Sequence, residues 1–269
     1  MGAQRMTGLP AEITERIQRE AAENDVIYRR RSAASLDLSA IHYGHAKMLE
    51  WAFQQLPSLK GARILDIGVG DGYSSVQLAL AGAQVTSIEV SAAALERVGT
   101  LAKRYNVNIE LQQMAGEDLR FEDASFDAIL CISAYHHMDL ERAAREFARV
   151  LRPGGRAVMV EPLISNPPAW LYRKIGWLFS REATTEERAL RIGDLTILER
   201  HFRKAGWQGI FLFSIALFGI DRLWENRNCT VQRLTKAAFE WVYPLDCRLL
   251  QALPMLQRIA WKIGIRADR

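Results

Sequence analysis

From residue 61 to residue 163, short apolar runs alternate with segments whose apolar residues recur every three or four positions. The runs are typical of buried strands, and the recurring segments are typical of helices that bury one face. The predicted strands are Arg63–Ile67, Gln84–Glu89, Asn108–Gln113, Phe126–Ile132 and Arg156–Glu161. The predicted helices are Ser74–Ala81, Ala92–Tyr105 and Leu140–Val150. This alternation predicts an α/β fold with a parallel sheet covered by helices on both faces.

The pattern is different on either side of this core. Before it, two helices are predicted, over Pro10–Arg31 and within Leu36–Leu56. After it, we predict a helix over Asp194–Ala205 that ends at Gly206, a strand over Trp207–Ser214, a helical insertion over about 217–259 and a last strand over Ala260–Arg266. Within the insertion, Pro244 is expected to break or kink the helix near Tyr243. We therefore divide the chain into an N-terminal helical cap (1–60) and a main domain (61–269).

The first predicted strand of the core runs into a glycine-rich loop. Asp66 ends the apolar run, and Gly68, Gly70 and Gly72 follow at alternate positions. Glycine has no Cβ, so such a loop lets a flat ligand lie against the backbone. Glu89 ends the next predicted strand, where a carboxylate can accept hydrogen bonds from both ribose hydroxyls of a nucleoside. The loop and the acid together predict a nucleoside-binding site.

In four stretches the chain resembles the class I S-adenosylmethionine (SAM)-dependent methyltransferases, and within them the small-molecule branch. In order, the stretches are Leu65–Gly72, Glu89, Gly116–Leu119 with Phe126-Asp127, and Arg149–Gly155. The resemblance implies a Rossmann-like, seven-stranded, mostly parallel sheet whose last strand is antiparallel and pairs with the sixth. The insertion at about 217–259 would then be a helical lid over the substrate.

The resemblance also implies roles for particular residues. Asp66 would lie near the methionyl end of SAM, Gly68, Gly70 and Gly72 would form the floor, and Glu89 would bind the ribose. An acid beside the adenine would be Glu117 or Asp118; the family pattern has its acid slightly earlier, so both stay open. The implied cofactor is SAM, with S-adenosyl-L-homocysteine as product.

Catalytic residues are harder to infer, because methyl transfer from a sulfonium mainly requires that the acceptor be held in line. A general base is needed only where the acceptor carries a proton. His136 and His137 follow the fourth predicted strand, at the edge of the sheet where ligands bind, and Glu161 ends the fifth. We predict these three as candidates, with plain structural roles as the alternative. His42, Tyr43 and His45 precede the first strand and could reach a substrate.

Composition adds limits on partners and location. The 269 residues carry a formal charge of +4, which permits an anionic ligand or peripheral contact with a membrane but does not suggest nucleic acid. The three cysteines show no CxxC spacing, and His42 and His45 lack companion acids, so no metal site is predicted. Met1–Pro10 contains no apolar signal-peptide core, which predicts a cytoplasmic protein.

The prediction is therefore an enzyme that methylates a small or medium-sized, partly hydrophobic molecule, with oxygen favoured as the acceptor atom. The aromatic-rich segment 166–180 suggests a greasy acceptor: a natural product, a lipid-like molecule or a modified peptide. Asn166–Trp170 resembles a nucleobase-methylation motif but follows the wrong strand, so we interpret it as a turn. The alternatives are an RNA or protein methyltransferase and a non-catalytic SAM-binding partner. An NAD dehydrogenase is disfavoured because Tyr73 stands where a third glycine is needed.

Overall fold

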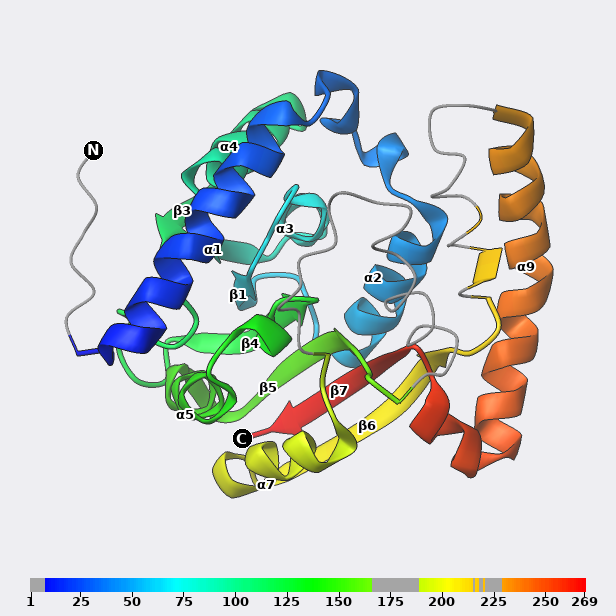
Figure 1. Cartoon of the computed structure of the whole chain (residues 1–269). Helices are drawn as coiled ribbons and strands as arrows, with labels where there is room; N and C mark the ends of the chain where they lie inside the picture. The colour runs from blue at the N-terminus through cyan, green and yellow to red at the C-terminus, as the bar shows by residue number, and fades with distance from the viewer. Residues whose placement is uncertain (1–7, 166–188, 215, 218–219, 221–228) are drawn as a thin grey trace.

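The computed structural model describes residues 8–165, 189–214, 216–217, 220 and 229–269. A single sheet runs through the molecule (Figure 1), with the strand order β3-β2-β1-β4-β5-β7-β6. Its strands are β1 (Arg63–Ile67), β2 (Gln84–Glu89), β3 (Ile109–Gln113), β4 (Phe126–Ile132), β5 (Leu151–Pro162), β6 (Lys204–Phe211) and β7 (Lys262–Asp268). The first five are parallel, and β7 lies antiparallel between β5 and β6. The seven-stranded, mostly parallel sheet is confirmed.

The longer helices of the described residues surround this sheet. They are α1 (Ala11–Arg30), α2 (Tyr43–Gln55), α3 (Tyr73–Leu80), α4 (Ala92–Arg104), α5 (Leu140–Val150), α7 (Thr196–His201) and α9 (Cys229–Ala252). Short 3-10 turns include η3 (Tyr135–His137) and η5 (Pro254–Ile259). The helices predicted over the core are confirmed to within a residue or two at their ends.

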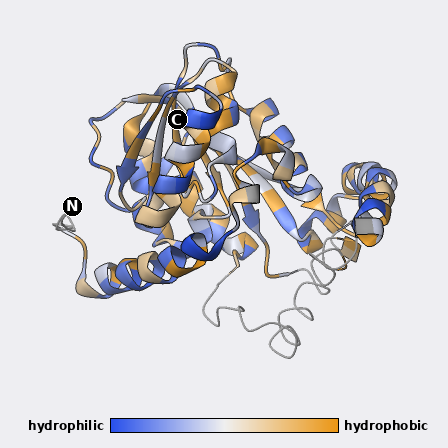
Figure 2. Ribbon diagram, turned by 90° about the horizontal axis from the view of Figure 1, so that it is seen from above, coloured by the Kyte–Doolittle hydropathy of each residue, from blue (hydrophilic) through white to orange (hydrophobic). Residues whose placement is uncertain are grey.

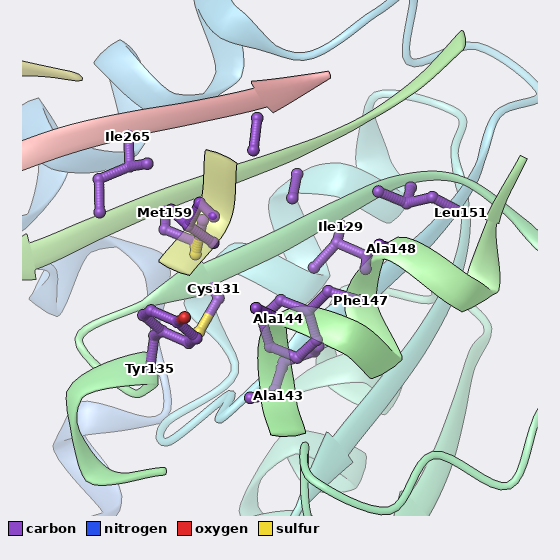
Figure 3. Close-up of a cluster of buried hydrophobic side chains, with 14 of the residues drawn as sticks. Ile129, Cys131, Tyr135, Ala143, Ala144, Phe147, Ala148, Leu151, Met159 and Ile265 are labelled. Carbon is purple, nitrogen blue, oxygen red and sulfur yellow. The ribbon is translucent and has the colours of Figure 1, made fainter. Parts of the chain in front are cut away.

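The hydrophobic core has two main parts because side chains along a strand point alternately to opposite faces. On β1, Leu65 belongs to the cluster under α5 and α7, whereas its neighbour Ile64 belongs to the cluster under α2 and α9. The close-up in Figure 3 shows Ala143, Ala144 and Phe147 of α5 turned toward the β4 side chains of the first cluster. Figure 2 shows that α1, by contrast, mixes hydrophilic and hydrophobic residues along its length.

Two predicted boundaries near the end of the chain are wrong. The helix predicted to reach Ala205 ends at His201, and β6 begins at Lys204. Lys204 to Gly206 pair with Asp268 to Arg266 of β7. Residues that the local pattern predicts as helix therefore form a strand, because they pair with a strand that is distant in sequence. Similarly, β5 begins at Leu151 rather than Arg156, since Leu151 pairs with Phe126 of β4.

Pro244 was predicted to break or kink its helix, and the break is wrong: α9 continues through Pro244 to Ala252. The proline removes the hydrogen bond to the carbonyl of Glu240, but both residues are exposed, so water can satisfy that group. Phe239 is buried against Tyr43 and Phe211, and on the other side of the proline Asp246 is fully buried. Contacts on both sides of Pro244 thus hold the helix on the sheet. Its role as a substrate lid remains a prediction.

Asp246 anchors α9 to the end of β6. Its carboxylate accepts backbone hydrogen bonds from Leu212, Phe213 and Ser214 at 2.9 to 3.0 Å, and one from the Ser214 hydroxyl at 2.6 Å. No helix among the described residues is both long and apolar enough to cross a membrane. The contacts of α9 are those of a helix packed on a sheet edge with one side buried.

We predict that Asp246→Ala lowers the free energy of unfolding by about 2–4 kcal/mol, because it leaves three backbone N–H groups without their acceptor. Glu240→Ala, on the exposed side of the same helix, should change it by less than about 0.5 kcal/mol. Urea unfolding of both variants checks this. Equal stabilities would show that Asp246 is not the anchor.

Candidate active site

Three buried acids lie where parallel strands end. Asp66 on β1, Glu89 on β2 and Glu161 on β5 are 1%, 7% and 0% exposed. Since β1 pairs with β2 and with β4, and β4 pairs with β5, these acids line one edge of the sheet. In open α/β sheets this carboxyl edge is where ligands bind. The three residues therefore lie along the same edge of the sheet.

The glycine loop between β1 and α3 needs glycine for both conformation and space. Gly68 has φ +68°, and a Cβ there would come within 2.3 Å of the Ala134 Cβ. Gly70 has φ +53°, and a Cβ there would come within 2.8 Å of the Tyr28 hydroxyl oxygen. Gly72 precedes α3 in the left-handed conformation. Neighbouring side chains thus approach the loop backbone more closely than any residue other than glycine would allow.

Glu89 is tied to this loop. One carboxylate oxygen accepts from the backbone N–H of Gly70 at 3.3 Å, and the other from Val90 at 2.9 Å and Ser91 at 3.2 Å. Burial nevertheless raises the pKa of Glu89 above its usual value, partly offset by these hydrogen bonds. The side chain is held next to Gly70, where the predicted ribose-binding role requires it.

Asp66 is held by the first turn of α3. One of its oxygens accepts from the hydroxyls of Ser74 and Ser75, both at 2.7 Å. Complete burial raises the pKa of Asp66 to about 6, although the two serines lower it, and nearby Glu89 raises it further. A cation close to Asp66 would stabilise its ionised form.

Helix α1, part of the predicted N-terminal cap, crosses this edge of the sheet. At one end, Arg16 donates to the side chain of Glu117 and to the backbone carbonyl of His137. In the middle, Asp25 accepts from the Ser91 hydroxyl at 2.6 Å and from the Ala93 N–H at 3.0 Å, capping α4. The helix therefore runs along the line of predicted cofactor residues.

The other end of α1 covers the glycine loop. The Tyr28 hydroxyl lies beside Gly70, and Arg31, just after the helix, pairs with Asp71. Arg97 of α4 pairs with the same carboxylate at 3.2 Å. The partners of Tyr28 and Arg31 are far away in sequence, so only the tertiary structure reveals them.

Glu20, also on α1, faces two other acids of the site. Burial is the main cause that raises its pKa to about 7; Arg16 lowers the pKa, while Glu117 and Glu89 raise it. One Glu20 oxygen lies 3.5 Å from Nδ1 of His137. Glu20 thus lies between the predicted adenine-side acid and the predicted ribose-binding acid.

Of the two acids left open for the adenine side, the structure brings Glu117 into the site. Its side chain is 2% exposed and accepts from the Asp139 N–H at 3.0 Å as well as from Arg16. Asp118 is half-buried, and its backbone N–H donates to Ala115. Arg16 of α1 connects Glu117 to the backbone of His137, because it donates to both. Among the described contacts, Asp118 has no such connection to α1.

His136 and Glu161 form a buried pair. Nδ1 of His136 lies 2.5 Å from one oxygen of Glu161, and the side chains are 5% and 0% exposed. The other oxygen accepts from the backbone N–H groups of Tyr135 at 2.9 Å and Ala134 at 3.1 Å. Glu161 therefore fixes the turn that carries the histidines and the orientation of the His136 ring. His137 is 30% exposed, and its ring centre lies 4.1 Å from that of His136.

A second cluster of polar side chains lies near the end of β4 and comes from elements that are distant in sequence. The buried Lys262 of β7 contacts the hydroxyl of Ser133, which follows β4. Burial, with the positive charge of Lys262, lowers the pKa of His45 on α2 to about 4, so its imidazole is neutral. The sequence predicted that His42, Tyr43 and His45 could reach a substrate, but it did not predict the Lys262–Ser133 contact. His42 caps α2 by accepting from the Gly44 N–H at 3.2 Å.

No group of His, Cys, Asp and Glu in the described part of the chain has the arrangement needed to hold a metal ion. The turn predicted at Asn166–Trp170 and the aromatic-rich segment 166–180 both lie outside the described residues.

Comparison with known proteins agrees with this architecture. Residues 65–159 match a family model described as "Methyltransferase domain". The ubiquinone biosynthesis O-methyltransferase of Alkalilimnicola ehrlichii is 35% identical over 130 residues, which are 48% of this chain and 52% of that protein. The 27-O-demethylrifamycin SV methyltransferase of Amycolatopsis mediterranei is 32% identical over 155 residues, 56% of each chain. The chain thus spans about half the length of these relatives.

The geranyl diphosphate C-methyltransferase of Streptomyces coelicolor has a similar fold. The two superpose with a TM-score of 0.62 at 15% identity, covering 97% of this chain and 100% of the other. The sheet order, the glycine loop and the acids at the strand ends define a Rossmann-like ligand-binding fold. Within this fold, residues 65–159 match the methyltransferase domain model, in agreement with the resemblance to class I SAM-dependent methyltransferases.

The Glu20 environment predicts a pH-dependent contribution of α1 to stability. Because the pKa of Glu20 is raised, its favourable neutral form is fully present below about 4.5 and is lost as the pH rises through about 7. The unfolding free energy of the wild type should therefore fall between pH 5 and pH 8. In Glu20→Gln it should fall by less, with a difference on the order of 1 kcal/mol. Urea unfolding at the two pH values measures it.

Glu15→Gln is the matched control, because Glu15 is exposed on the same helix. The two variants are compared by the change in their unfolding free energy between pH 5 and pH 8. If Glu20→Gln alters this change no more than Glu15→Gln does, the assigned environment of Glu20 is wrong.

Proposed function

We propose that the protein is a SAM-dependent methyltransferase acting on a small or medium-sized, partly hydrophobic acceptor through an oxygen atom. The observation that carries the proposal is that one sheet edge combines a glycine loop without side chains, the adjacent Glu89 and the buried His136–Glu161 pair. The first two features suit a nucleoside cofactor, and the third suits removal of a proton. Methyl transfer to a protonated oxygen needs both.

The cofactor residues fit SAM on chemical grounds. Gly68, Gly70 and Gly72 leave backbone bare where a side chain would collide. Glu89 lies next to Gly70 and would accept from the ribose hydroxyls, and buried Asp66 would face the cationic methionyl amino group, directly or through water. When bound, SAM supplies an electrophilic methyl group.

At the adenine end, Glu117 is favoured over Asp118 because it is buried in the same network as α1. Arg16, Glu20 and Tyr28 of α1 would then cover the cofactor and exclude water from it. This supports a role for residues 1–60 as a cap on the site.

For the reaction itself, we assign different roles to the three candidates. Nδ1 of His136 is engaged by Glu161; when that nitrogen carries the hydrogen, Nε2 has a free lone pair and can take a proton from the acceptor. Glu161 is then a positioning residue, since its oxygens are occupied by His136 and by backbone N–H groups. His137 is the second candidate base, less buried and near Glu20.

The nature of the acceptor is supported by the relatives. Two of them are named as a ubiquinone biosynthesis O-methyltransferase and a 27-O-demethylrifamycin SV methyltransferase. Lys262, Ser133 and neutral His45 would provide polar contacts on the side of the site away from α5. An ammonium there favours an acceptor with an acidic hydroxyl, whose oxygen gains negative charge as its proton leaves.

Replacing Glu89 tests the cofactor assignment. Glu89→Ala should weaken SAM binding by about 10- to 100-fold, because two hydrogen bonds to a charged acceptor are lost. Isothermal titration calorimetry with SAM and with S-adenosylhomocysteine measures the change. Glu96→Ala, at an exposed position of α4, is the control and should bind as the wild type does. Unchanged affinity in Glu89→Ala would remove the ribose assignment.

Methyl transfer tests the activity. With methyl-labelled SAM and an organic extract of cells, label should enter low-mass, extractable products, and His136→Ala should slow this by roughly 10²–10⁴-fold at unchanged SAM affinity. Mass analysis of the product would identify the acceptor. Label entering protein or RNA would instead support a macromolecular substrate. SAM binding without transfer to extract or to a panel of phenols would favour a non-catalytic SAM-binding protein.

A further inference from the structure

The outer side of α9 carries an exposed apolar stripe. It consists of Leu234, Trp241 and Leu245, which are 65%, 84% and 50% exposed, and continues after the helix with Leu253 and Met255, which are 46% and 74% exposed. An 84% exposed tryptophan is unusual, because its large apolar surface normally finds a partner within the fold. We call these five residues the α9 stripe.

The stripe is continuous and faces away from the protein. Steps of seven and four residues place Leu234, Trp241 and Leu245 on one side of a helix, over a length of about 16 Å. The opposite side of α9 is the buried one, with Phe239, Asp246 and Leu250. Figure 1 shows α9 along the outer margin of the molecule, and the exposed stripe lies on the side of α9 opposite its buried residues.

The charges around the stripe have one dominant sign. Within residues 229–259, the exposed charged side chains are those of Arg233, Lys236, Arg248 and Arg258, and one acid, Glu240. A helix with an exposed apolar face that includes tryptophan, bordered by basic residues, is typical of segments that lie in the interface of an anionic bilayer. Each basic residue near such a surface contributes about 1 kcal/mol of attraction.

The same charges disfavour a second copy of the chain as the occupant. In a two-fold contact with α9 antiparallel to its copy around Trp241, the residues near 234 of one helix face those near 248 of the other. Arg233 would then face Arg248 twice, with Glu240 as the one exposed acid on each helix to compensate. An anionic lipid surface meets the apolar and the basic residues at once.

We propose that the α9 stripe docks the protein on an anionic phospholipid bilayer. Trp241, Leu245 and Leu234 enter the boundary between headgroups and acyl chains, and the neighbouring arginines and Lys236 face lipid phosphates. The proposal is independent of the methyl-transfer activity, because neither the stripe nor its basic neighbours belong to the site at the strand ends.

The test is co-sedimentation of the full chain with sucrose-loaded vesicles, made either of phosphatidylcholine or of phosphatidylcholine mixed with phosphatidylglycerol. The wild type should bind the mixed vesicles at least about 10-fold more tightly, and added salt should weaken that binding. The double variant Trp241→Ser/Leu245→Ser should lose roughly 10- to 100-fold in affinity, as expected for two apolar side chains removed from the interface.

The matched control is Leu80→Ser, since Leu80 is also 51% exposed but lies on α3. It should bind vesicles as the wild type does. Thermal unfolding and SAM binding of each variant show that the fold is kept. Equal sedimentation of the double variant and the wild type, or no binding by the wild type, would overturn the proposal. So would light scattering that finds a wild-type dimer and a monomeric double variant, because the stripe would then be a contact between copies.

Discussion

Burial of carboxylates at one edge of the sheet is the constraint around which this molecule is built. Asp66, Glu89 and Glu161 are almost fully buried, and an ionised carboxylate in such a place is costly unless it accepts hydrogen bonds. Each acid has such donors: serine hydroxyls of α3, backbone N–H groups around Gly70 and Ser91, or those of the η3 turn. The acids therefore fix the loops that form the site, and the donors hold the acids in place.

Helix α1 adds to this constraint from the other side. It brings Glu20 toward Glu89 and Glu117, so that three acids face one another, with Arg16 as their nearby cation. The raised pKa of Glu20 follows from this crowding and from burial. A ligand in the site would have to accommodate α1, because Tyr28 lies directly beside Gly70. In the proposed function, the cap and the cofactor share one surface.

At the β6–β7 end of the sheet, the connection between the strands determines the structure. The β6–β7 pair is antiparallel, and 50 residues separate Phe211 from Lys262, which pairs with it. Asp246 ties the connecting helix α9 back to the end of β6 and so leaves the opposite side of that helix outside the fold. The exposed position of Trp241 follows from this anchoring and not from any weakness of the core.

The sequence by itself determined the alternation of strands and helices, the strand ends and the acids at those ends, because buried parallel strands are continuous apolar runs that stop where polar residues begin. Asp66, the three glycines, Glu89 and Glu161 could be found for this reason. The tertiary structure decided whatever depends on residues distant in the chain. Pairing with β7 moved the start of β6 to Lys204, anchoring carried α9 through Pro244, and packing brought Arg16, Glu20, Tyr28 and Lys262 to the site. Local periodicity reports which face of an element is buried, but not which distant side chain will meet it.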